Sequence, residues 1–297
     1  MPSNRSALVS AHHIRGSDVR CWTYPSVGPS AGVVLAVHGF RGDHHGLQLL
    51  VDQLAEYTVV VPDLPGFGAS TPMDATPHDA AGYAAVVAEL AGELGLGPRT
   101  TLLGHSFGSI IAAFHLAAHP GSFGRLVLIN PICEPALEGS NALMSRAAAA
   151  FYAAGALLPE SVGERLLRSR MISDLMSATM TKSTDPAVRA YVKDQHRRYF
   201  GRFSGRETLR EAFDASINRT VRQVAPAIGA PTLLVAGALD ELGSVEGQEE
   251  LAAEFPAAEL RVIDGVGHLI HYERPAAAAG HIRAFLASWA EPAQLTK

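Results

Sequence analysis

Short runs of apolar residues constrain the fold of this chain more than any other feature of the sequence. They cover residues 32–37, 58–61, 100–103, 126–129, 232–235 and 260–263. Apolar and polar residues do not alternate in these runs, which is typical of parallel strands that helices bury on both faces. Two further runs, 7–14 and 19–24, flank the turn residues Gly16, Ser17 and Asp18 and predict an antiparallel pair at one edge of the sheet.

Helix-like segments lie between most of these runs. They cover residues 46–55, 80–94, 106–119, 244–255 and 275–289. Strands that alternate with helices predict an α/β fold with a doubly wound sheet.

The alternation breaks once, between residues 132 and 222, where no strand-like run occurs. The helical stretches of this region are separated by glycine and proline, at Gly139, Gly155, Pro159, Gly163, Pro186, Gly201 and Gly205. A structureless loop of this length is implausible in a compact domain. We therefore predict a core of residues 1–131 and 223–297, with a helical cap of residues 132–222 inserted between two strands.

Charge and cysteine content exclude several classes of protein. The 297 residues are 47% hydrophobic and carry a formal net charge of -5, which argues against nucleic acid or an anionic membrane surface as the main partner. The polar N-terminus lacks the apolar stretch of a secretory signal and predicts a cytoplasmic protein, and the alanine-rich stretch 147–158 is too short to span a bilayer. Cys21 and Cys133 form no CxxC pair, so neither a disulfide framework nor a zinc site is indicated.

A serine between two glycines carries the strongest chemical signal. The motif Gly104-His105-Ser106-Phe107-Gly108 follows one strand-like run and begins a helix-like segment. This order of strand, sharp turn and helix places Ser106 on a nucleophile elbow. The glycines let strand and helix approach closely, and the free N–H groups at the helix start favour the anion that forms during attack.

A serine hydroxyl needs a base, and the base needs a carboxylate that fixes its tautomer. Asp240 follows the run 232–235, and His268 follows the run 260–263. Both side chains should emerge with Ser106 at the carboxyl ends of neighbouring parallel strands. The order Ser, Asp, His is the one expected for such a fold.

Other residues compete for these two roles. Asp264 is closer to His268 in the sequence, but it directly follows the last strand, where an aspartate more often caps a turn. Glu134 follows the run 126–129 and could reach the histidine from another strand end. His271 lies where a helix is about to begin, so we expect a packed, hydrogen-bonded histidine there.

The oxyanion that forms during attack needs two backbone donors. Phe107 supplies one by its position after the nucleophile. The segment His38-Gly39-Phe40-Arg41-Gly42 follows the run 32–37, and the N–H of Phe40 is the expected second donor. The polar residues that follow, Arg41, His44 and His45, could face the mouth of the pocket, but solvated loop positions are the better expectation.

These motifs, together with the loop Asp63-Leu64-Pro65-Gly66-Phe67-Gly68-Ala69-Ser70, resemble those of the α/β-hydrolase superfamily, in the branch with a helical cap. The resemblance covers nearly the whole chain. It implies an eight-stranded, mostly parallel sheet, a cap over Ser106, an oxyanion hole from Phe40 and Phe107, and neither a metal nor an organic cofactor. Epoxide hydrolases and haloalkane dehalogenases of similar shape have an aspartate where Ser106 stands here, so the serine disfavours those activities.

The expected activity is hydrolysis of a carboxylic ester with a small or medium apolar acyl group, through an acyl-enzyme on Ser106. Carbon–carbon bond hydrolases, thioesterases and lactonases with the same triad stay open, as does a non-catalytic protein that binds a ligand in the pocket. The expected partner is a small-molecule substrate, and a homodimer stays open. Apolar cap residues should line the acyl pocket or form the core of the cap; they are Leu143, Met144, Phe151, Tyr152, Leu157, Leu158, Met171, Leu175, Met176 and Met180.

Overall fold

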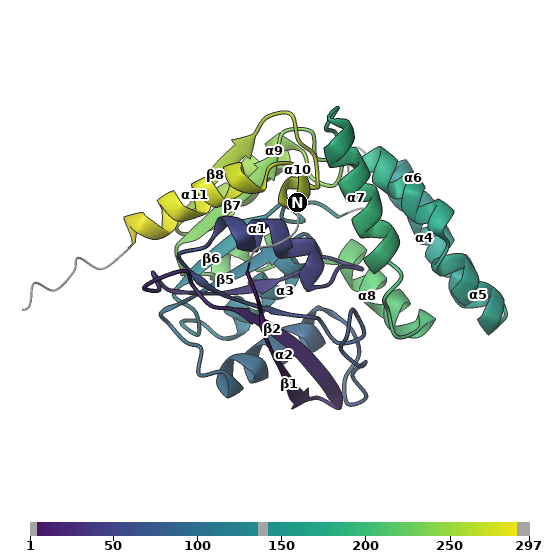
Figure 1. Cartoon of the computed structure of the whole chain (residues 1–297), viewed down its shortest axis with the longest axis horizontal. Coiled ribbons are helices and arrows are strands. Elements are labelled where there is room, and N and C mark those ends of the chain that lie inside the picture. The colour runs from purple at the N-terminus through teal and green to yellow at the C-terminus, as the bar shows by residue number, and fades with distance from the viewer. Residues whose placement is uncertain (1–4, 136–141, 290–297) are drawn as a thin grey trace, which may run out of the picture.

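The computed structural model describes residues 5–135 and 142–289 and has the mostly parallel, eight-stranded sheet that the sequence predicts (Figure 1). The strands are β1 (Leu8–Ile14), β2 (Ser17–Tyr24), β3 (Val33–Val37), β4 (Thr58–Pro62), β5 (Thr100–His105), β6 (Arg125–Ile129), β7 (Thr232–Gly237) and β8 (Ala258–Ile263). Their order in the sheet is β1-β2-β4-β3-β5-β6-β7-β8. The β1–β2 and β2–β4 pairs are antiparallel, and the remaining pairs are parallel.

The central strands are apolar throughout because both of their faces are buried. In β6, Leu126 and Leu128 belong to one core cluster, while Val127 and Ile129 belong to another on the opposite face. Successive strand residues point to opposite faces, so a strand between two helical layers needs apolar side chains at every position.

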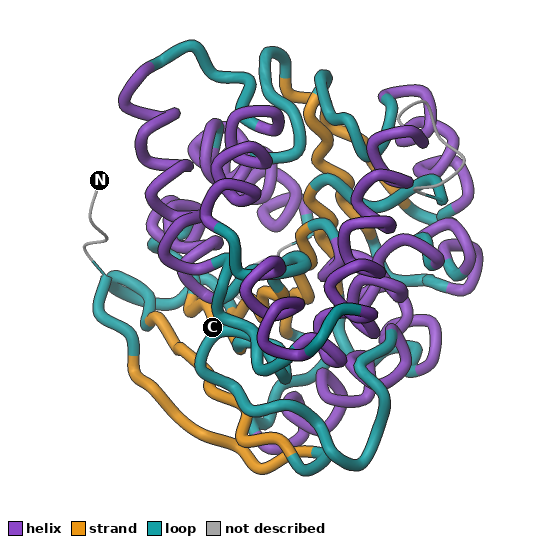
Figure 2. The backbone as a smooth tube through the Cα atoms, turned by 90° about the vertical axis from the view of Figure 1, so that its right-hand side faces the viewer, coloured by secondary structure: helices purple, strands orange, loops and turns teal. Residues whose placement is uncertain are grey.

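Helices cover both faces of the sheet (Figure 2). Side chains of α2 (Ala80–Glu93), α3 (Phe107–Ala118) and α9 (Val245–Glu254) enter one core cluster, and those of α1 (Gln48–Gln53) and α11 (Pro275–Ser288) enter the other. The short helices η1 (His44–Leu47) and α10 (Ile270–Glu273) lie at the strand ends. None of the helices in the described part of the chain is both long and apolar enough to cross a membrane.

Five consecutive helices lie between β6 and β7, on one side of the molecule (Figure 1). They are α4 (Ala142–Leu157), α5 (Glu160–Leu167), α6 (Arg170–Met180), α7 (Pro186–Tyr199) and α8 (Arg206–Asn218). The short helices η2 (Val221–Gln223) and η3 (Ala225–Ala227) lead from them to β7. We call α4–α8 the helical segment.

Two glycines that the sequence suggested as helix breaks lie inside helices instead. Gly155 is within α4 and Gly163 within α5. A Cβ atom on Gly155 would lie 2.6 Å from the Leu167 side chain, and a Cβ on Gly163 would lie 2.1 Å from the carbonyl oxygen of Gly155. These glycines therefore permit a close crossing of α4 and α5. Gly139, also expected to separate helices, lies outside the described residues.

Helix α6 turns its serines toward α7 and two of its larger apolar side chains toward solvent. This arrangement corrects part of the prediction for the apolar residues of this region. Met171 and Leu175 are 75% and 61% exposed, whereas Ser173 and Ser177 are buried against α7. The Ser177 hydroxyl bonds to Nδ1 of His196 on α7 at 2.6 Å. The small serines allow close packing of the two helices and turn the larger side chains outward.

Leu157 and Leu158 at the end of α4 are also exposed, so they and the two outward residues of α6 do not form a core. Tyr152, in contrast, is buried as expected. The side chains of Leu143 and Met144 lie outside the described part of the structure.

Candidate active site

Ser106 stands in a strained turn between β5 and α3. Its φ of 53° and ψ of -120° lie outside the regions that residues with a side chain ordinarily adopt. The flanking glycines make this turn possible. A Cβ on Gly104 would lie 2.3 Å from the carbonyl oxygen of Gly108, and a Cβ on Gly108 would lie 2.3 Å from that of Val37. Strand, turn and helix thus meet at distances that only glycine allows.

Three side chains predicted from separate motifs lie in hydrogen-bond contact at the carboxyl ends of β5, β7 and β8. Nε2 of His268 is 2.8 Å from Oγ of Ser106. Nδ1 of His268 is 3.1 Å and 3.0 Å from the two carboxylate oxygens of Asp240. One of these oxygens also accepts a 2.9 Å hydrogen bond from the main-chain N–H of Leu242. The carboxylate thus favours the tautomer that carries a proton on Nδ1 and leaves Nε2 to accept the serine proton.

The residues that competed for these roles lie elsewhere. Asp264 is exposed in the turn after β8. Glu134 accepts a 3.0 Å hydrogen bond from the hydroxyl of Ser244. His271 is buried on α10, where its ring packs against the rings of His105 and Tyr272.

Electrostatics separate His268 from its histidine neighbours. Burial opposes protonation of His268, but the charge and hydrogen bond of Asp240 outweigh burial and raise its pKa above the ordinary 6.5. Burial lowers the pKa of His105 to about 3 and that of His271 well below 6.5. Of these three, only His268 is poised to take up a proton near neutral pH.

Asn130, directly after β6, organises the loops that carry His268 and Asp240, and the sequence analysis did not single it out. Its side-chain amide donates hydrogen bonds to the carbonyl oxygens of Gly267 and His268, at 3.1 and 2.8 Å. Its side-chain oxygen accepts a 2.8 Å bond from the N–H of Gly237. Asn130 is fully buried and has a φ of 42°, a conformation that asparagine tolerates better than most residues. An asparagine right after a buried strand is the signal that could have identified it.

The loop after β3 lies against Ser106. A Cβ on Gly39 would lie 3.1 Å from the Cβ of Ser106, so the backbone of this loop passes directly beside the serine. Phe40 follows in the loop, and Phe107 is the first residue of α3, where N–H groups lack acceptors within the helix. His38 steadies the loop, since its Nδ1 donates to the Gly39 carbonyl oxygen at 2.8 Å and its Nε2 accepts a 2.9 Å bond from the N–H of Leu64.

The expectation of solvated side chains at Arg41, His44 and His45 is wrong. Arg41 is 2% exposed and His44 is 7% exposed, and His45 is partly buried. The ring of His44 stacks on Trp22 of β2 with a centroid distance of 3.5 Å. Arg41 and His45 instead contact the helical segment. The ring of His45, for example, stacks on Tyr199 at the end of α7 with a centroid distance of 3.9 Å.

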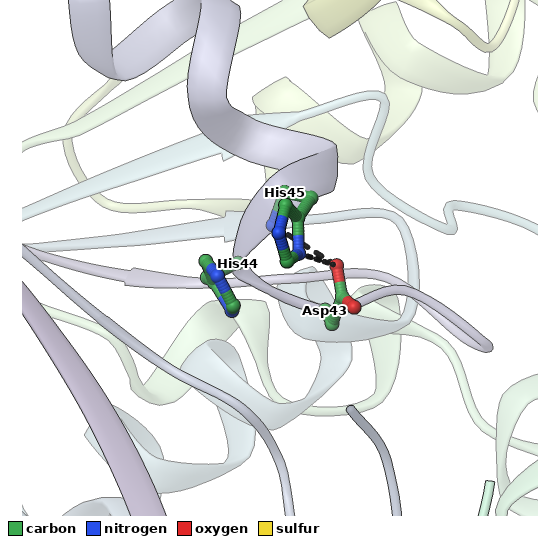
Figure 3. A group of neighbouring side chains, drawn as sticks. All are labelled: Asp43, His44 and His45. Atoms are coloured by element: carbon green, nitrogen blue, oxygen red, sulfur yellow. Dashed lines mark hydrogen bonds and ion pairs between the residues drawn. The ribbon is translucent and has the colours of Figure 1, made fainter. Parts of the chain in front are cut away.

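Asp43, His44 and His45 are the one group of three ligand-type side chains in the described part of the chain whose ligand atoms lie within 4.8 Å of one another (Figure 3). Their arrangement does not suit a metal ion. Nδ1 of His44 bonds to Asp63 at 2.9 Å, whereas Nδ1 of His45 bonds to Asp43 at 3.1 Å. The two rings are tilted by 37° to each other with a centroid distance of 3.9 Å, and each Nδ1 is directed to a different carboxylate. The group is better described as two separate histidine–carboxylate pairs.

Comparison with known proteins assigns the family. Residues 32–275 match the model of the alpha/beta hydrolase fold family, which is most of the chain. The chain is an α/β-hydrolase. This α/β-hydrolase is 24% identical to Lipase 3 of a Moraxella species over 85% of its own length and 76% of the relative. It is also 24% identical to a monoacylglycerol lipase of Xenopus laevis, over 90% of its own length and 79% of the relative.

Solved structures support the same assignment of the fold. The α/β-hydrolase superposes on a thermophilic esterase from Thermogutta terrifontis with a TM-score of 0.73 and 21% sequence identity. The match covers 96% of this chain and 99% of the esterase.

Proposed function

We propose that this α/β-hydrolase is a serine esterase in which Ser106 is the nucleophile, His268 the general base and Asp240 the carboxylate that orients the histidine. One observation carries the proposal. His268 contacts the Ser106 hydroxyl through Nε2 at 2.8 Å while its Nδ1 contacts Asp240 at 3.0 Å. A buried base held between a nucleophile and an orienting carboxylate is the arrangement that acyl transfer needs.

The reaction proceeds in two stages. The Ser106 hydroxyl passes its proton to Nε2 of His268 as its oxygen attacks the ester carbonyl carbon, and His268 then protonates the departing alkoxide as the ester C–O bond breaks. An acyl-enzyme on Ser106 remains. Water, deprotonated by His268, attacks the acyl carbon and releases the acid, which restores the serine. In both stages the backbone N–H groups of Phe40 and Phe107 hold the oxyanion.

The helical segment is the cap of this enzyme and, with its flanking residues, forms the predicted insertion of residues 132–222. Two facts support this role. Ser106 is only 9% exposed, and the ring of Phe40 packs against Tyr152 of α4 and Phe213 of α8, with centroid distances of 5.5 and 5.7 Å. Substrate therefore reaches the serine between the cap and the carboxyl edge of the sheet. The aromatic rings there favour a small or medium apolar acyl group.

The names of the two curated relatives, both lipases, agree with ester hydrolysis. Hydrolysis of p-nitrophenyl esters from acetate to palmitate tests the proposal, with the wild type, Ser106→Ala and Ser122→Ala compared. Ser122 is a matched control because it lies in the turn after α3 and its hydroxyl donates to the His119 carbonyl oxygen. We expect Ser106→Ala to lower kcat by roughly 10⁴- to 10⁶-fold and Ser122→Ala to leave it within about twofold.

Other outcomes of this experiment point to the remaining alternatives. A wild type that turns over none of the esters, yet is labelled covalently on Ser106 by a fluorophosphonate, indicates a carbon–carbon bond hydrolase, thioesterase or lactonase. A wild type that neither turns over esters nor is labelled indicates a binding protein. Cytoplasmic location stays a prediction from the sequence, and a homodimer stays open.

A further inference from the structure

Arg41 is a buried arginine that follows the proposed oxyanion residue Phe40 directly. It is 2% exposed and is the largest fully buried side chain in the described part of the protein. Its guanidinium group donates to the carbonyl oxygen of Phe200 at 3.0 Å, to that of Leu167 at 2.9 Å and to the hydroxyl of Tyr152 at 3.2 Å. None of the described carboxylates forms an ion pair with it. Three neutral acceptors on three separate parts of the cap hold its N–H groups, and the Phe200 and Phe203 ring centroids lie 5.9 and 5.6 Å from its central carbon.

The backbone of Arg41 adds a second, independent observation. The N–H of Gly42 donates to the carbonyl oxygen of Gly39 at 3.0 Å, which closes a tight turn around Phe40 and Arg41. Arg41 has a φ of 60° in this turn, in the left-handed region that favours glycine. An arginine is thus locally disfavoured here, and its side-chain bonds to the cap offset that preference.

The same turn is in contact with the nucleophile at its other end, where a Cβ on Gly39 would lie 3.1 Å from that of Ser106. Arg41 therefore joins the turn beside Ser106 to the helices above it. The guanidinium group bonds to α4 and to the ends of α5 and α7. If any of these moves relative to the core, either its bond to Arg41 breaks or the turn that carries Arg41 is displaced.

The part of the cap that Arg41 holds is itself seated on the core. The N–H of Gly68 donates to the Arg202 carbonyl oxygen at 2.9 Å, and the N–H of Ser204 donates to that of Gly66 at 2.8 Å. His45 is oriented by its bond to Asp43 (Figure 3). Its ring stacks on Tyr199, at the start of residues 199–204. Residues 199–204 thus form a fixed surface against which the guanidinium group is positioned.

We propose that Arg41 is a positioning residue that couples the seating of the cap to the oxyanion hole, and that it aligns the N–H of Phe40 when the cap is in place. This inference rests on the proposed function, because it requires Phe40 to be an oxyanion donor. The geometry of the hydrogen bonds carries the effect, because the guanidinium fork donates to all three acceptors at once. A lysine at this position has one nitrogen and cannot span them.

The first part of the test compares Arg41→Lys, Arg41→Met and Arg41→Gly with Arg168→Met in steady-state ester hydrolysis. Arg168 is a matched control because it bonds to the carbonyl oxygens of Gly201 and Phe203 in the same cap segment but belongs to the cap itself. We expect the three Arg41 variants to lower kcat by about tenfold or more with KM changed less than about threefold, because the donor acts mainly in the transition state. Arg168→Met should leave kcat within about threefold of the wild type.

Arg41→Gly separates the effect of the side chain on kcat from the effect of the backbone conformation. Glycine suits the positive φ, so a position that matters only for the turn would tolerate this change or improve with it. A loss of kcat equal to that of Arg41→Met assigns the effect to the guanidinium group.

The second part of the test measures inhibition by an alkyl trifluoromethyl ketone. Its carbonyl carbon bonds to Oγ of Ser106, the serine proton passes to His268, and the carbonyl oxygen becomes the oxyanion. The inhibition constant should rise in the Arg41 variants by the same factor as kcat falls, which a general loosening of the cap would not produce.

Thermal melting of each variant checks that it is folded. If the Arg41 variants do not fold, Tyr152→Phe, which removes one of the three acceptors and keeps the ring, should still lower kcat by about threefold.

The inference is overturned if the Arg41 variants keep wild-type kcat, or if Arg168→Met lowers kcat and raises the inhibition constant to the same extent. A folded Tyr152→Phe with unchanged kcat counts against it in the same way. These failures differ from failure of the proposed function, which would appear as ester turnover that survives in Ser106→Ala.

Discussion

The side-chain amide of Asn130 donates a 2.8 Å hydrogen bond to the main-chain carbonyl oxygen of His268. This bond joins the end of β6 to the loop after β8, and a second bond from Gly237 to the Asn130 side chain adds the end of β7. The relative positions of His268 and Asp240 are therefore set by a buried side chain that belongs to neither loop.

Asn130→Ala should consequently impair both folding and activity. It leaves buried carbonyl and N–H groups without their partner and places alanine at a positive φ, so we expect a loss of about 2–4 kcal/mol in the free energy of unfolding. Misplacement of the histidine should lower kcat by about tenfold or more. Urea unfolding and ester kinetics measure the two effects. Asn218→Ala, at the exposed end of α8, is the control and should change neither, since Asn218 only caps a carbonyl of its own helix.

Gly108→Ala should disrupt the elbow. The added Cβ would lie 2.3 Å from the carbonyl oxygen of Val37, a backbone atom that cannot move without shifting β3. We expect the free energy of unfolding to fall by about 3 kcal/mol or more. Most of the ester activity should be lost as well. Gly92→Ala on α2 is the matched comparison, because its Cβ would meet nothing within 4 Å. Gly92 lies in the last turn of α2, so alanine there should stabilise the protein by up to about 0.5–1 kcal/mol. Equal effects of the two changes in chemical unfolding would show that the close packing at Gly108 does not exist.

The pH dependence of kcat/KM should report the raised pKa of His268. Only neutral His268 can accept the serine proton, so activity should fall as pH drops through this pKa, with its half-loss above pH 6.5. Asp240→Asn removes the charge that raises the pKa. The half-loss should then shift to lower pH, and the plateau should fall by roughly 10³- to 10⁴-fold.

Asp264→Asn provides the control for this profile, because Asp264 is exposed and only follows β8 in the sequence. Its pH profile should match that of the wild type. A profile that shifts with Asp264→Asn but not with Asp240→Asn would reverse the assignment of the two carboxylates.

Features with a local signal could be predicted from the sequence. The sheet could be predicted because buried strands are apolar at every position, and the positions of Ser106, Asp240 and His268 follow because each stands just after a strand. The burial of Arg41 could not be predicted, since it depends on Tyr152, Leu167 and Phe200, whose positions the local sequence does not determine. A polar residue in a surface loop is usually solvated, and Arg41 is buried only because helices pack over its loop.

The helical segment was the hardest part to predict in detail. Its extent between two strands follows from the missing strand pattern, but its packing does not. Gly155 and Gly163 would break isolated helices, yet here they permit a close crossing. Ser177 faces α7, where its hydroxyl bonds to the His196 ring, a contact that no local pattern indicates.

The most direct test of the central claim is to identify the atom that forms the covalent bond. The wild type, Ser106→Ala and His268→Ala are each treated with diethyl p-nitrophenyl phosphate, and digested peptides are examined by mass spectrometry while residual ester hydrolysis is followed. If Ser106 is the nucleophile activated by His268, the wild type gains one diethylphosphoryl group on the peptide that contains Ser106, in step with loss of activity, and both variants stay unlabelled. Labelling at another residue, or ester hydrolysis that persists in Ser106→Ala, would contradict this account.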